Sequence, residues 1–387
     1  MSMFFVIFAF FFLYLGWRWI YPLKIRPAGK VLLAIGLLLI CAKFPLSQYV
    51  FGGLAAPHLP RAVLMVYGWL FGSVLLLFIL TLIKDALLLL ARLAEKISGR
   101  ALGFSAAIGR RAFLLIPLVF ILGAAGVWQA VKTPEVKNTE VFLPQLPPEL
   151  DGLTIVQLTD LHVSELLPAA WLKAVADKTN ALEPDLILLT GDLIDGSVAR
   201  RFGDVGALLG LKARYGVLAC LGNHEYISGL EPWVEAYGRL GLSLLRNEGR
   251  LLNIRGREIF VGAVTDPAAG SPRFRRPGQD APAGPDIAAA LRGAPPEAFK
   301  ILMAHQPKLA RQNAAAGVDL QLSGHTHGAQ ILGFGLLGAP ANGGFVRGWY
   351  EVGPMKLYVS NGSGLWNGFP MRLGVHSEIT RLTLRAR

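Results

Sequence analysis

Four long apolar stretches in the first third of the sequence constrain this chain more than any other feature. They cover residues 4–21, 31–54, 62–83 and 112–131. Each is close to the ~20 residues that an α-helix needs to cross the hydrocarbon core of a bilayer. The chain is 53% hydrophobic overall, which is more than an ordinary soluble domain contains. We therefore expect an all-α transmembrane region of about four helices over residues 1–132.

The distribution of positive charge predicts the orientation of these helices. Residues 1–140 contain 14 Lys+Arg against 4 Asp+Glu, so they carry ten of the twelve net positive charges. Most of these basic residues lie in the loops after the first and third stretches, and such loops stay on the cytoplasmic side. Four crossings satisfy both loops and place everything after residue 131 outside the cytoplasm. Lys43 and Pro45 interrupt the second stretch, so a re-entrant or interfacial helix is the alternative there.

The rest of the chain has a different composition. Residues 141–387 hold 24 Lys+Arg against 22 Asp+Glu, and this near neutrality argues against a nucleic-acid partner. Residues 133–149 are rich in proline, as an extended linker would be. We expect a linker at 133–149 and a catalytic domain at 150–387. The two cysteines, Cys41 and Cys220, both lie in apolar runs and do not form a disulfide framework.

Short apolar runs in residues 150–387 are each followed by residues that bind metals. Helical patterns between several of the runs, notably at 168–180 and 198–213, predict strands that are neighbours in a largely parallel arrangement. In such sheets the ligand crevice lies at the carboxyl ends of the strands. Five of the seven histidines follow such runs. The motifs are Asp160-Leu161-His162, Gly191-Asp192-Leu193-Ile194-Asp195, Gly222-Asn223-His224-Glu225, His305 and Gly324-His325-Thr326-His327.

The mixture of ligand types indicates the class of metal. On extended backbone, His325 and His327 would point to the same side of the chain. Aspartate and asparagine oxygens together with neutral imidazoles suit manganese, iron or zinc better than calcium. The ligands exceed one tetrahedral site, whereas two cations roughly 3.5–4 Å apart can share a carboxylate. Asp192 is the natural bridge.

The order of these motifs resembles that of the calcineurin-like metallophosphoesterases. Together with the apolar start, the chain resembles their bacterial membrane-associated branch. The resemblance covers about residues 150–387 and implies an α/β fold, a four-layer α/β/β/α sandwich. It also implies that two divalent cations (Mn, Fe or Zn) are bound, the first by Asp160, His162, Asp192 and His327, and the second by Asp192, Asn223, His305 and His325.

The same resemblance implies roles for two further residues. His224 would donate a proton to the leaving-group oxygen or stabilise the developing charge, and Asp195 would orient His224. From the residues alone, Asp195 is equally consistent with a cap for a helix that starts near Ser197. For Glu225, a role at the site and an exposed loop carboxylate explain the residue equally well.

The expected function is that of a metal-dependent phosphoric ester hydrolase, either a phosphatase or a phosphodiesterase, in which a hydroxide between the metals attacks in line. The resemblance and the charge pattern place it in the bacterial inner membrane, with membrane lipids as partners and an envelope or lipid-linked phosphate ester as substrate. The alternatives are a cytoplasm-facing pyrophosphatase of a nucleotide-linked lipid precursor and a noncatalytic metal-dependent sensor.

Several other segments are candidates for substrate contact. The loop at 265–286 is long and carries three arginines, so it is either a lid, a headgroup contact or a solvated loop. Residues 361–366 are expected to form a further wall of the crevice. The arginines that could reach a phosphate, with surface charge as the alternative, are Arg200, Arg201, Arg273, Arg275, Arg276, Arg347 and Arg372.

Overall fold

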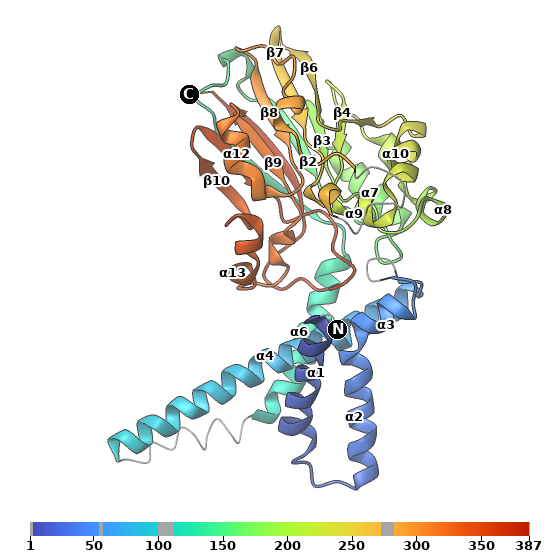
Figure 1. The fold of residues 1–387 in the computed structure, drawn as a ribbon, viewed down its shortest axis with the longest axis vertical. Coiled ribbons are helices and arrows are strands. Elements are labelled where there is room, and N and C mark those ends of the chain that lie inside the picture. Colours follow the sequence, from blue (N-terminus) through green and yellow to red (C-terminus); the bar gives the residue numbers. More distant parts are fainter. Residues whose placement is uncertain (1–2, 54–56, 100–111, 272–281, 387) are drawn as a thin grey trace. The chain divides into compact units, whose positions relative to one another are not determined.

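The computed structural model describes residues 3–53, 57–99, 112–271 and 282–386. Arg273, Arg275 and Arg276 of the long loop lie outside the described residues. The chain divides into two compact units. One consists of Met1–Trp128 with Gly368–Met371, and the other of Gln129–Asn367 with Arg372–Arg387. The first is helical and the second contains all the strands (Figure 1).

Among its described residues, the helical part of the chain has two helices that are long and apolar enough to cross a membrane, Arg61–Ser98 and Ala112–Val131. A third span results if the pair Pro27–Cys41 and Lys43–Tyr49, bent by 58°, crosses as one. The first expected span, residues 4–21, forms only shorter helical segments. The elements of this part of the chain are α1 (Met3–Leu15), η1 (Gly16–Ile20), α2 (Pro27–Cys41), α3 (Lys43–Tyr49), α4 (Arg61–Ser98), η2 (Ala112–Leu114) and α6 (Leu115–Val131).

The helix α4 is longer than a bilayer requires. Its 38 residues span about 57 Å at 1.5 Å per residue, nearly twice the hydrocarbon thickness of about 30 Å. The helix continues beyond the third apolar stretch through residues 86–97. The parity argument for the orientation needs four crossings, so the extracytoplasmic location of the α/β unit stays a prediction.

Aromatic and polar contacts hold the helices of this unit together. Phe11 stacks on Phe78 with ring centroids 3.9 Å apart, which packs α1 against α4. The hydroxyl of Tyr14 donates to a carboxylate oxygen of Asp85 at 2.6 Å. Arg18 forms an ion pair with the same carboxylate. The carboxylate of Asp85 is therefore paired with a hydroxyl and a guanidinium group, as expected for a charged side chain within an apolar helical unit.

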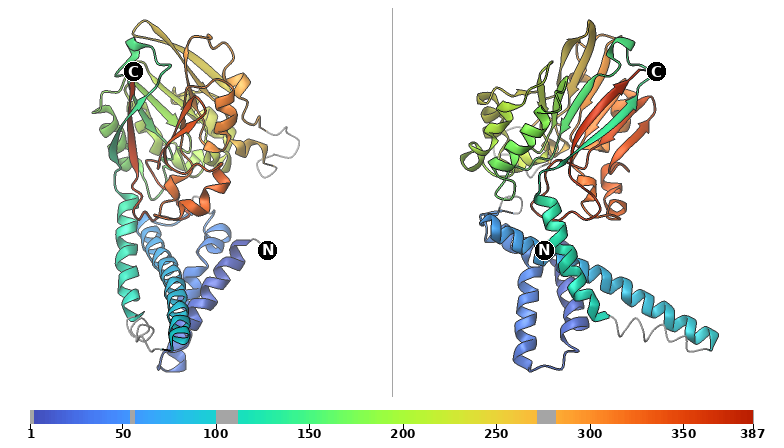
Figure 2. Two further views of the ribbon diagram at one scale, coloured as in Figure 1. Left: turned by 90° about the vertical axis from the view of Figure 1, so that its left-hand side faces the viewer. Right: turned by 180° about the vertical axis from the view of Figure 1, so that it is seen from behind.

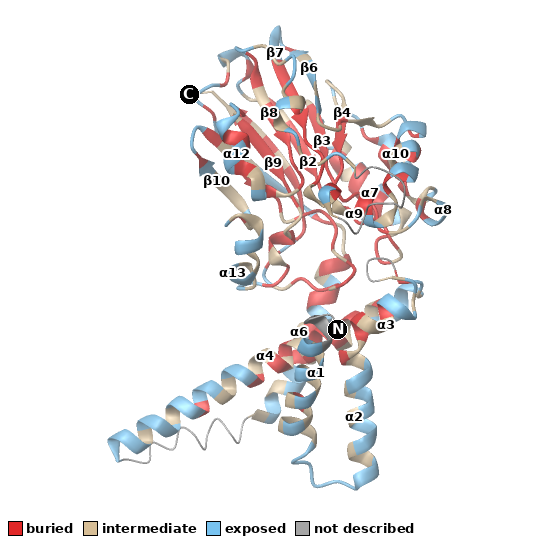
Figure 3. Ribbon diagram, in the orientation of Figure 1, coloured by how far each residue is buried: buried red, intermediate tan, exposed pale blue. Residues whose placement is uncertain are grey.

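The α/β unit consists of two six-stranded mixed sheets that face each other (Figure 2). Side chains of both sheets form one buried core (Figure 3). The first sheet has the order β1 (Glu135–Phe142), β12 (Glu378–Arg385), β2 (Thr154–Leu158), β3 (Leu186–Thr190), β4 (Val217–Cys220) and β5 (Ser243–Leu244). The second has the order β10 (Gly348–Val352), β11 (Met355–Val359), β9 (Leu320–Ser323), β8 (Phe299–Met303), β7 (Arg257–Ala263) and β6 (Glu248–Ile254).

Helices cover the outer faces and complete the predicted four-layer α/β/β/α sandwich (Figure 1). The predicted helix at 168–180 is confirmed as α7 (Ala169–Asn180). The helix predicted at 198–213 is shorter, because glycines interrupt it. The remaining elements are η3 (Pro148–Leu150), α8 (Val198–Arg201), η4 (Asp204–Gly210), α9 (Asn223–Ser228), α10 (Leu230–Arg239), η5 (Pro267–Gly270), α11 (Ile287–Ala290), η7 (Pro307–Leu309), α12 (Ala310–Ala315), η8 (His327–Ala329), α13 (Gly335–Gly338) and η9 (Pro340–Asn342).

The expected linker at 133–149 is not a linker throughout its length. Its residues Glu135–Phe142 form β1, which pairs in parallel with β12 along its whole length. β1 is an edge strand, and Val141 is its only buried side chain. An edge strand with one buried side chain lacks the apolar alternation by which strands are recognised in a sequence.

Candidate metal centre

The candidate site lies where the strand ends of the two sheets meet. The sequence predicted one crevice at the ends of five strands, and the structure divides these strands between the sheets, with β2, β3 and β4 in one and β8 and β9 in the other. A hydrogen bond joins the two sets, because Nδ1 of His305 after β8 lies 2.8 Å from the carbonyl oxygen of Thr190 at the end of β3. The backbone N–H of Gly324 in turn donates to the carbonyl oxygen of His305 at 2.9 Å.

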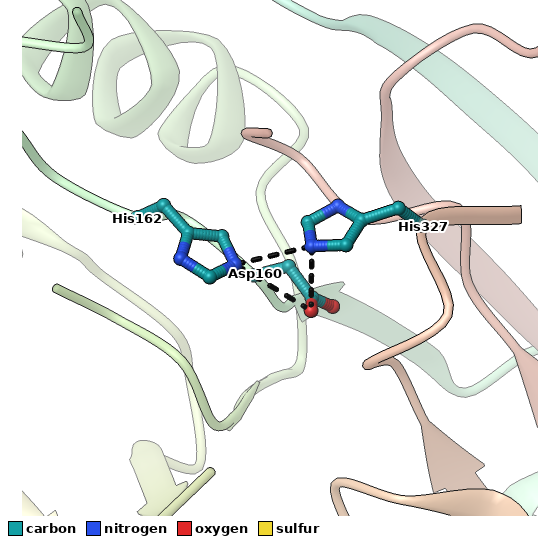
Figure 4. Close-up of side chains that lie close together, drawn as sticks. All are labelled: Asp160, His162 and His327. Carbon is teal, nitrogen blue, oxygen red and sulfur yellow. Dashed lines mark hydrogen bonds and ion pairs between the residues drawn. The ribbon is translucent and has the colours of Figure 1, made fainter. Parts of the chain in front are cut away.

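A first cluster consists of Asp160, His162 and His327 (Figure 4). All three side chains are buried. Nε2 of His162 lies 3.1 Å from Nε2 of His327, and Nε2 of His327 lies 3.4 Å from Oδ1 of Asp160. Three atoms with lone pairs thus converge on one small volume among buried side chains. A cation or a proton is needed there to offset their mutual repulsion.

A second cluster consists of Asp192, His305 and His325. The bond to Thr190 requires a proton on Nδ1 of His305, so the lone pair of the neutral ring is on Nε2. This Nε2 lies 3.1 Å from Oδ2 of Asp192. A backbone carbonyl that holds the far nitrogen of the ring is the usual support of a metal-binding histidine.

Asn223 also fits a metal site. Its Oδ1 is buried and has no hydrogen-bond partner among the described residues. A buried carbonyl oxygen without a partner carries a desolvation cost that a bound cation would remove. Carboxylate, amide and imidazole ligands together suit divalent cations.

Asp192 belongs to more than one group of potential ligands. Its Oδ2 lies 3.6 Å from Nε2 of His162 in the first cluster and 3.1 Å from Nε2 of His305 in the second. Its Oδ1 accepts a hydrogen bond from the backbone N–H of His224 at 2.7 Å. One oxygen is therefore held by the backbone, and the other faces the imidazoles of both clusters.

Glu225 holds the loops that carry Asp192 and His224. Its carboxylate accepts hydrogen bonds from the backbone N–H groups of Asp192 at 3.1 Å, Leu193 at 2.8 Å and Gly222 at 2.7 Å. The side chain is fully buried, so it is not the exposed loop carboxylate that the sequence left open. Glu225 is the third residue of α9, and its bond to the backbone N–H of Gly222, the residue before the helix, is the side-chain half of a capping box.

The backbone is strained at several of the candidate ligands. Asp160, Asp192, His325 and His327 all have positive φ, between 50° and 70°. The expectation of extended backbone for the two histidines is therefore wrong, because β9 ends at Ser323 before either of them. Side chains other than glycine rarely adopt this region, and such strain is concentrated at functional sites. The two imidazoles consequently point into different clusters rather than to one side of a strand.

His224 and Asp195 form a buried pair. Nδ1 of His224 and Oδ1 of Asp195 are within hydrogen-bond distance. Burial by itself lowers the pKa of His224, but the carboxylates of Asp195 and Asp192 outweigh it and raise this pKa to about 9. The imidazole is thus kept in the form that can donate a proton. Asp195 does not cap the following helix, whose first flanking residue is Ser197.

Asn367 and Arg372 support the site from the C-terminal part of the chain. Nδ2 of Asn367 donates to Oδ2 of Asp195 at 2.9 Å, a contact that no sequence pattern indicated. Arg372 is fully buried and donates to the carbonyl oxygens of Gly364 at 2.7 Å and His327 at 3.3 Å. It therefore positions the backbone of a candidate ligand and is neither a phosphate contact at the surface nor a solvated charge.

The segment 361–366 lies beside the first cluster, as expected for a wall of the crevice. The backbone N–H of Gly364 donates to the carbonyl oxygen of Asp160 at 2.9 Å. Among the other arginines considered as phosphate contacts, Arg201 is buried and paired with Glu165 and Asp204, whereas Arg347 is exposed. The described residues bring the candidate ligands together in the two clusters and leave His58 and His376 outside them.

Comparison with known proteins is consistent with this geometry. The sequence model of the calcineurin-like phosphoesterase family matches residues 153–329. A metallophosphoesterase of Helicobacter pylori is 36% identical over 261 residues. The match covers 67% of this chain and 66% of the Helicobacter protein, slightly less than two thirds of that protein's length. A metallophosphoesterase of Campylobacter jejuni is 35% identical over 70% of this chain and 69% of its own length. A zebrafish (Danio rerio) "transmembrane protein with metallophosphoesterase domain" is 32% identical over 71% of this chain and 63% of its own length.

Proposed function

The chain belongs to the calcineurin-like metallophosphoesterases, and from this premise we propose that it hydrolyses a phosphate ester with two divalent cations that share Asp192. The observation that carries the proposal is the pair of Asp/His clusters on either side of one buried carboxylate. Asp160, His162 and His327 would hold one cation together with Asp192. Asn223, His305 and His325 would hold the other.

The cations, when bound, would activate a water molecule and offset the negative charge of the phosphate. The protein supplies the remaining parts. His224, whose pKa is raised by the carboxylates of Asp195 and Asp192, would donate its Nε2 proton to the leaving-group oxygen. Glu225 and Arg372 hold the backbone of Asp192 and of His327, so that the ligands keep their positions while the charge on the phosphate changes.

The helical unit associates the protein with a membrane, since two or three of its helices are long and apolar enough to cross one. We place the protein in the bacterial inner membrane with its α/β unit outside the cytoplasm. The charge of the loops supports this orientation. An envelope or lipid-linked phosphate ester is then the substrate within reach, and membrane lipids are the partners. The near neutrality of residues 141–387 supports the exclusion of nucleic acid.

Two other functions compete with this proposal. A cytoplasm-facing pyrophosphatase of a nucleotide-linked lipid precursor would use the same site in the opposite orientation. A noncatalytic metal-dependent sensor would need a broken ligand set, and every candidate ligand is present in the sequence. The first alternative is distinguished by topology and the second by turnover.

The reaction is tested by turnover of the full chain in detergent. Phosphomonoesters, phosphodiesters and lipid pyrophosphates would be compared with Mn²⁺, Fe²⁺ and Zn²⁺ present in turn. We expect hydrolysis of at least one ester class that a chelator abolishes and an added metal restores. If the protein binds two metals and hydrolyses none of the three classes, the catalytic proposal is excluded and the sensor is favoured.

The orientation is tested by reporters fused after Arg387. Alkaline phosphatase needs disulfides and is active only outside the cytoplasm, whereas green fluorescent protein reports a cytoplasmic location. The alkaline phosphatase fusion would carry Asp192→Asn, so that hydrolysis comes from the reporter alone. We expect an active phosphatase fusion and a dark fluorescent fusion. The opposite pair of results would place the α/β unit in the cytoplasm and support the pyrophosphatase.

A further inference from the structure

An uncharged apolar segment follows the candidate ligand His327 directly. Between His327 and Arg347 the sequence contains no Asp, Glu, Lys or Arg. Within it, residues 332–341, named here the apolar loop, include α13 and most of η9. Leu332, Leu336 and Leu337 are 64%, 84% and 80% exposed. Figure 3 shows the ribbon around α13 coloured mainly as exposed or intermediate. A patch of this kind marks an interaction surface.

The apolar loop is held at both ends. At its start, Ile331 is buried and forms β-bridges with Leu373 and Gly374, and the backbone N–H of Leu332 donates to the carbonyl oxygen of Leu373 at 2.9 Å. Further along, Gly335 lies against the side chain of Val346. The exposure of the leucines is therefore a feature of a fixed segment rather than of a fraying end.

Basic side chains accompany this apolar surface. Lys308, Arg311 and Arg347 are all exposed. Nη1 of Arg311 donates to the carbonyl oxygen of Gly343 at 2.9 Å, and the backbone of Lys308 lies against the same glycine. Exposed apolar residues next to basic ones are the combination that binds the surface of an anionic bilayer, with the leucines in the acyl boundary and the cations at the headgroups.

The connection between the two units keeps a bilayer within reach. Only Lys132, Thr133 and Pro134 separate α6, the last apolar helix, from β1. This connection spans at most about 10 Å. The α/β unit is thus tethered directly to the end of a helix that can cross a membrane.

From these observations we propose that the apolar loop inserts into the surface of the lipid bilayer, with Leu336 and Leu337 in the acyl boundary and Lys308, Arg311 and Arg347 at anionic headgroups. The apolar loop begins five residues after His327, so the bilayer surface lies beside the first cluster. If the chain has the proposed function, a further consequence follows: a phosphate ester in a lipid headgroup would reach the metals without leaving the membrane.

The proposal is tested with a fluorescent probe on the full chain in lipid nanodiscs that contain anionic lipid. An environment-sensitive label is attached to Leu336→Cys, since Cys41 and Cys220 are buried and free. The matched control is Leu209→Cys in η4, an exposed leucine (59%) of the same unit. We expect lipids with a quencher near the headgroup to quench the label at position 336 severalfold more than the label at position 209.

Two results would overturn the proposal. Equal quenching at both positions would show that the apolar loop is not in the bilayer. A label at position 336 that is shielded from aqueous iodide but not quenched by lipid would show that it contacts protein instead. The readout needs no turnover, so an inactive protein with a quenched label would refute the proposed function while leaving the membrane contact intact.

A charge variant examines the headgroup contact independently. Arg347→Gln removes an exposed cation without changing the apolar loop itself. We expect it to reduce the lipid quenching at position 336 in anionic nanodiscs and to have little effect in neutral ones. The same decrease in both lipids would contradict the role of anionic headgroups.

Discussion

Asp192→Asn is expected to remove metal from both clusters and to abolish turnover. The backbone N–H of His224 donates to Oδ1 of Asp192, so the carbonyl oxygen of an asparagine would be retained at that position. Its NH₂ group would then replace Oδ2, the atom that faces Nε2 of His305 at 3.1 Å and Nε2 of His162 at 3.6 Å. A donor group in the place of a shared ligand oxygen repels a cation on either side.

The effect of Asp192→Asn should exceed that of losing a supporting residue. Replacing a residue that supports a metal ligand typically lowers the metal affinity 10–100-fold. We therefore expect Asp192→Asn to lower the metal affinity by more than about 100-fold. Elemental analysis and turnover of the purified chain would measure it. Asp177→Asn, the same change at an exposed position on α7, should leave both values unchanged. Two metals per chain in Asp192→Asn would contradict the shared carboxylate.

His224→Ala is expected to keep the metal content and to lower turnover by about 10²–10⁴-fold, the range typical of a lost general acid or base. The reason is that His224 can supply a proton to the leaving group. Substrates whose leaving groups need no proton should lose less activity. This dependence separates a proton donor from a residue that only supports the fold, because structural damage would affect all substrates equally.

Metal analysis decides between the two roles that the geometry allows for His224. His224 also lies close to His162 and Asp192, and these three residues form a third possible group of ligands. If metal is lost with His224→Ala, the residue is a ligand and its role as a proton donor is wrong. Asp195→Asn should reduce turnover in the same way, and the double variant should lose little more, since the pair acts as a unit. His376→Ala, outside the clusters, is the matched control.

The sequence predicted the composition of the candidate site because metal-binding residues follow each strand. Apolar runs identify strands, and residues after the carboxyl ends of parallel strands gather at one edge. For this reason Asp160, Asp192 and His305 could be assigned to one site although they are far apart in the chain. The same reasoning did not predict how these strands divide between the two sheets of the sandwich. Which strands pair depends on contacts between distant segments, which periodicity does not contain.

Roles that depend on burial could not be predicted. For Arg372 the sequence left open a phosphate contact or a surface charge, and the side chain is fully buried against backbone carbonyls. For Glu225 it left open an exposed loop carboxylate, and the side chain binds three backbone N–H groups. Long polar side chains are mostly exposed in proteins, so the sequence favours the surface unless the partners are known. The strand β1 was missed for a related reason, because an edge strand needs few apolar residues.

The sequence by itself determined the family, the apolar character of the first 131 residues and the chemistry of the candidate ligands, since all three depend on residue type and order. The resemblance implied how the candidate ligands divide, whereas the backbone geometry that allows this division is a property of the tertiary structure. His325 and His327 both have positive φ after the end of β9, and this backbone turns one imidazole toward Asp192 and His305 and the other toward Asp160 and His162. Such strained conformations are stable only because the surrounding sheets and loops hold them, so they follow from packing and not from the local sequence.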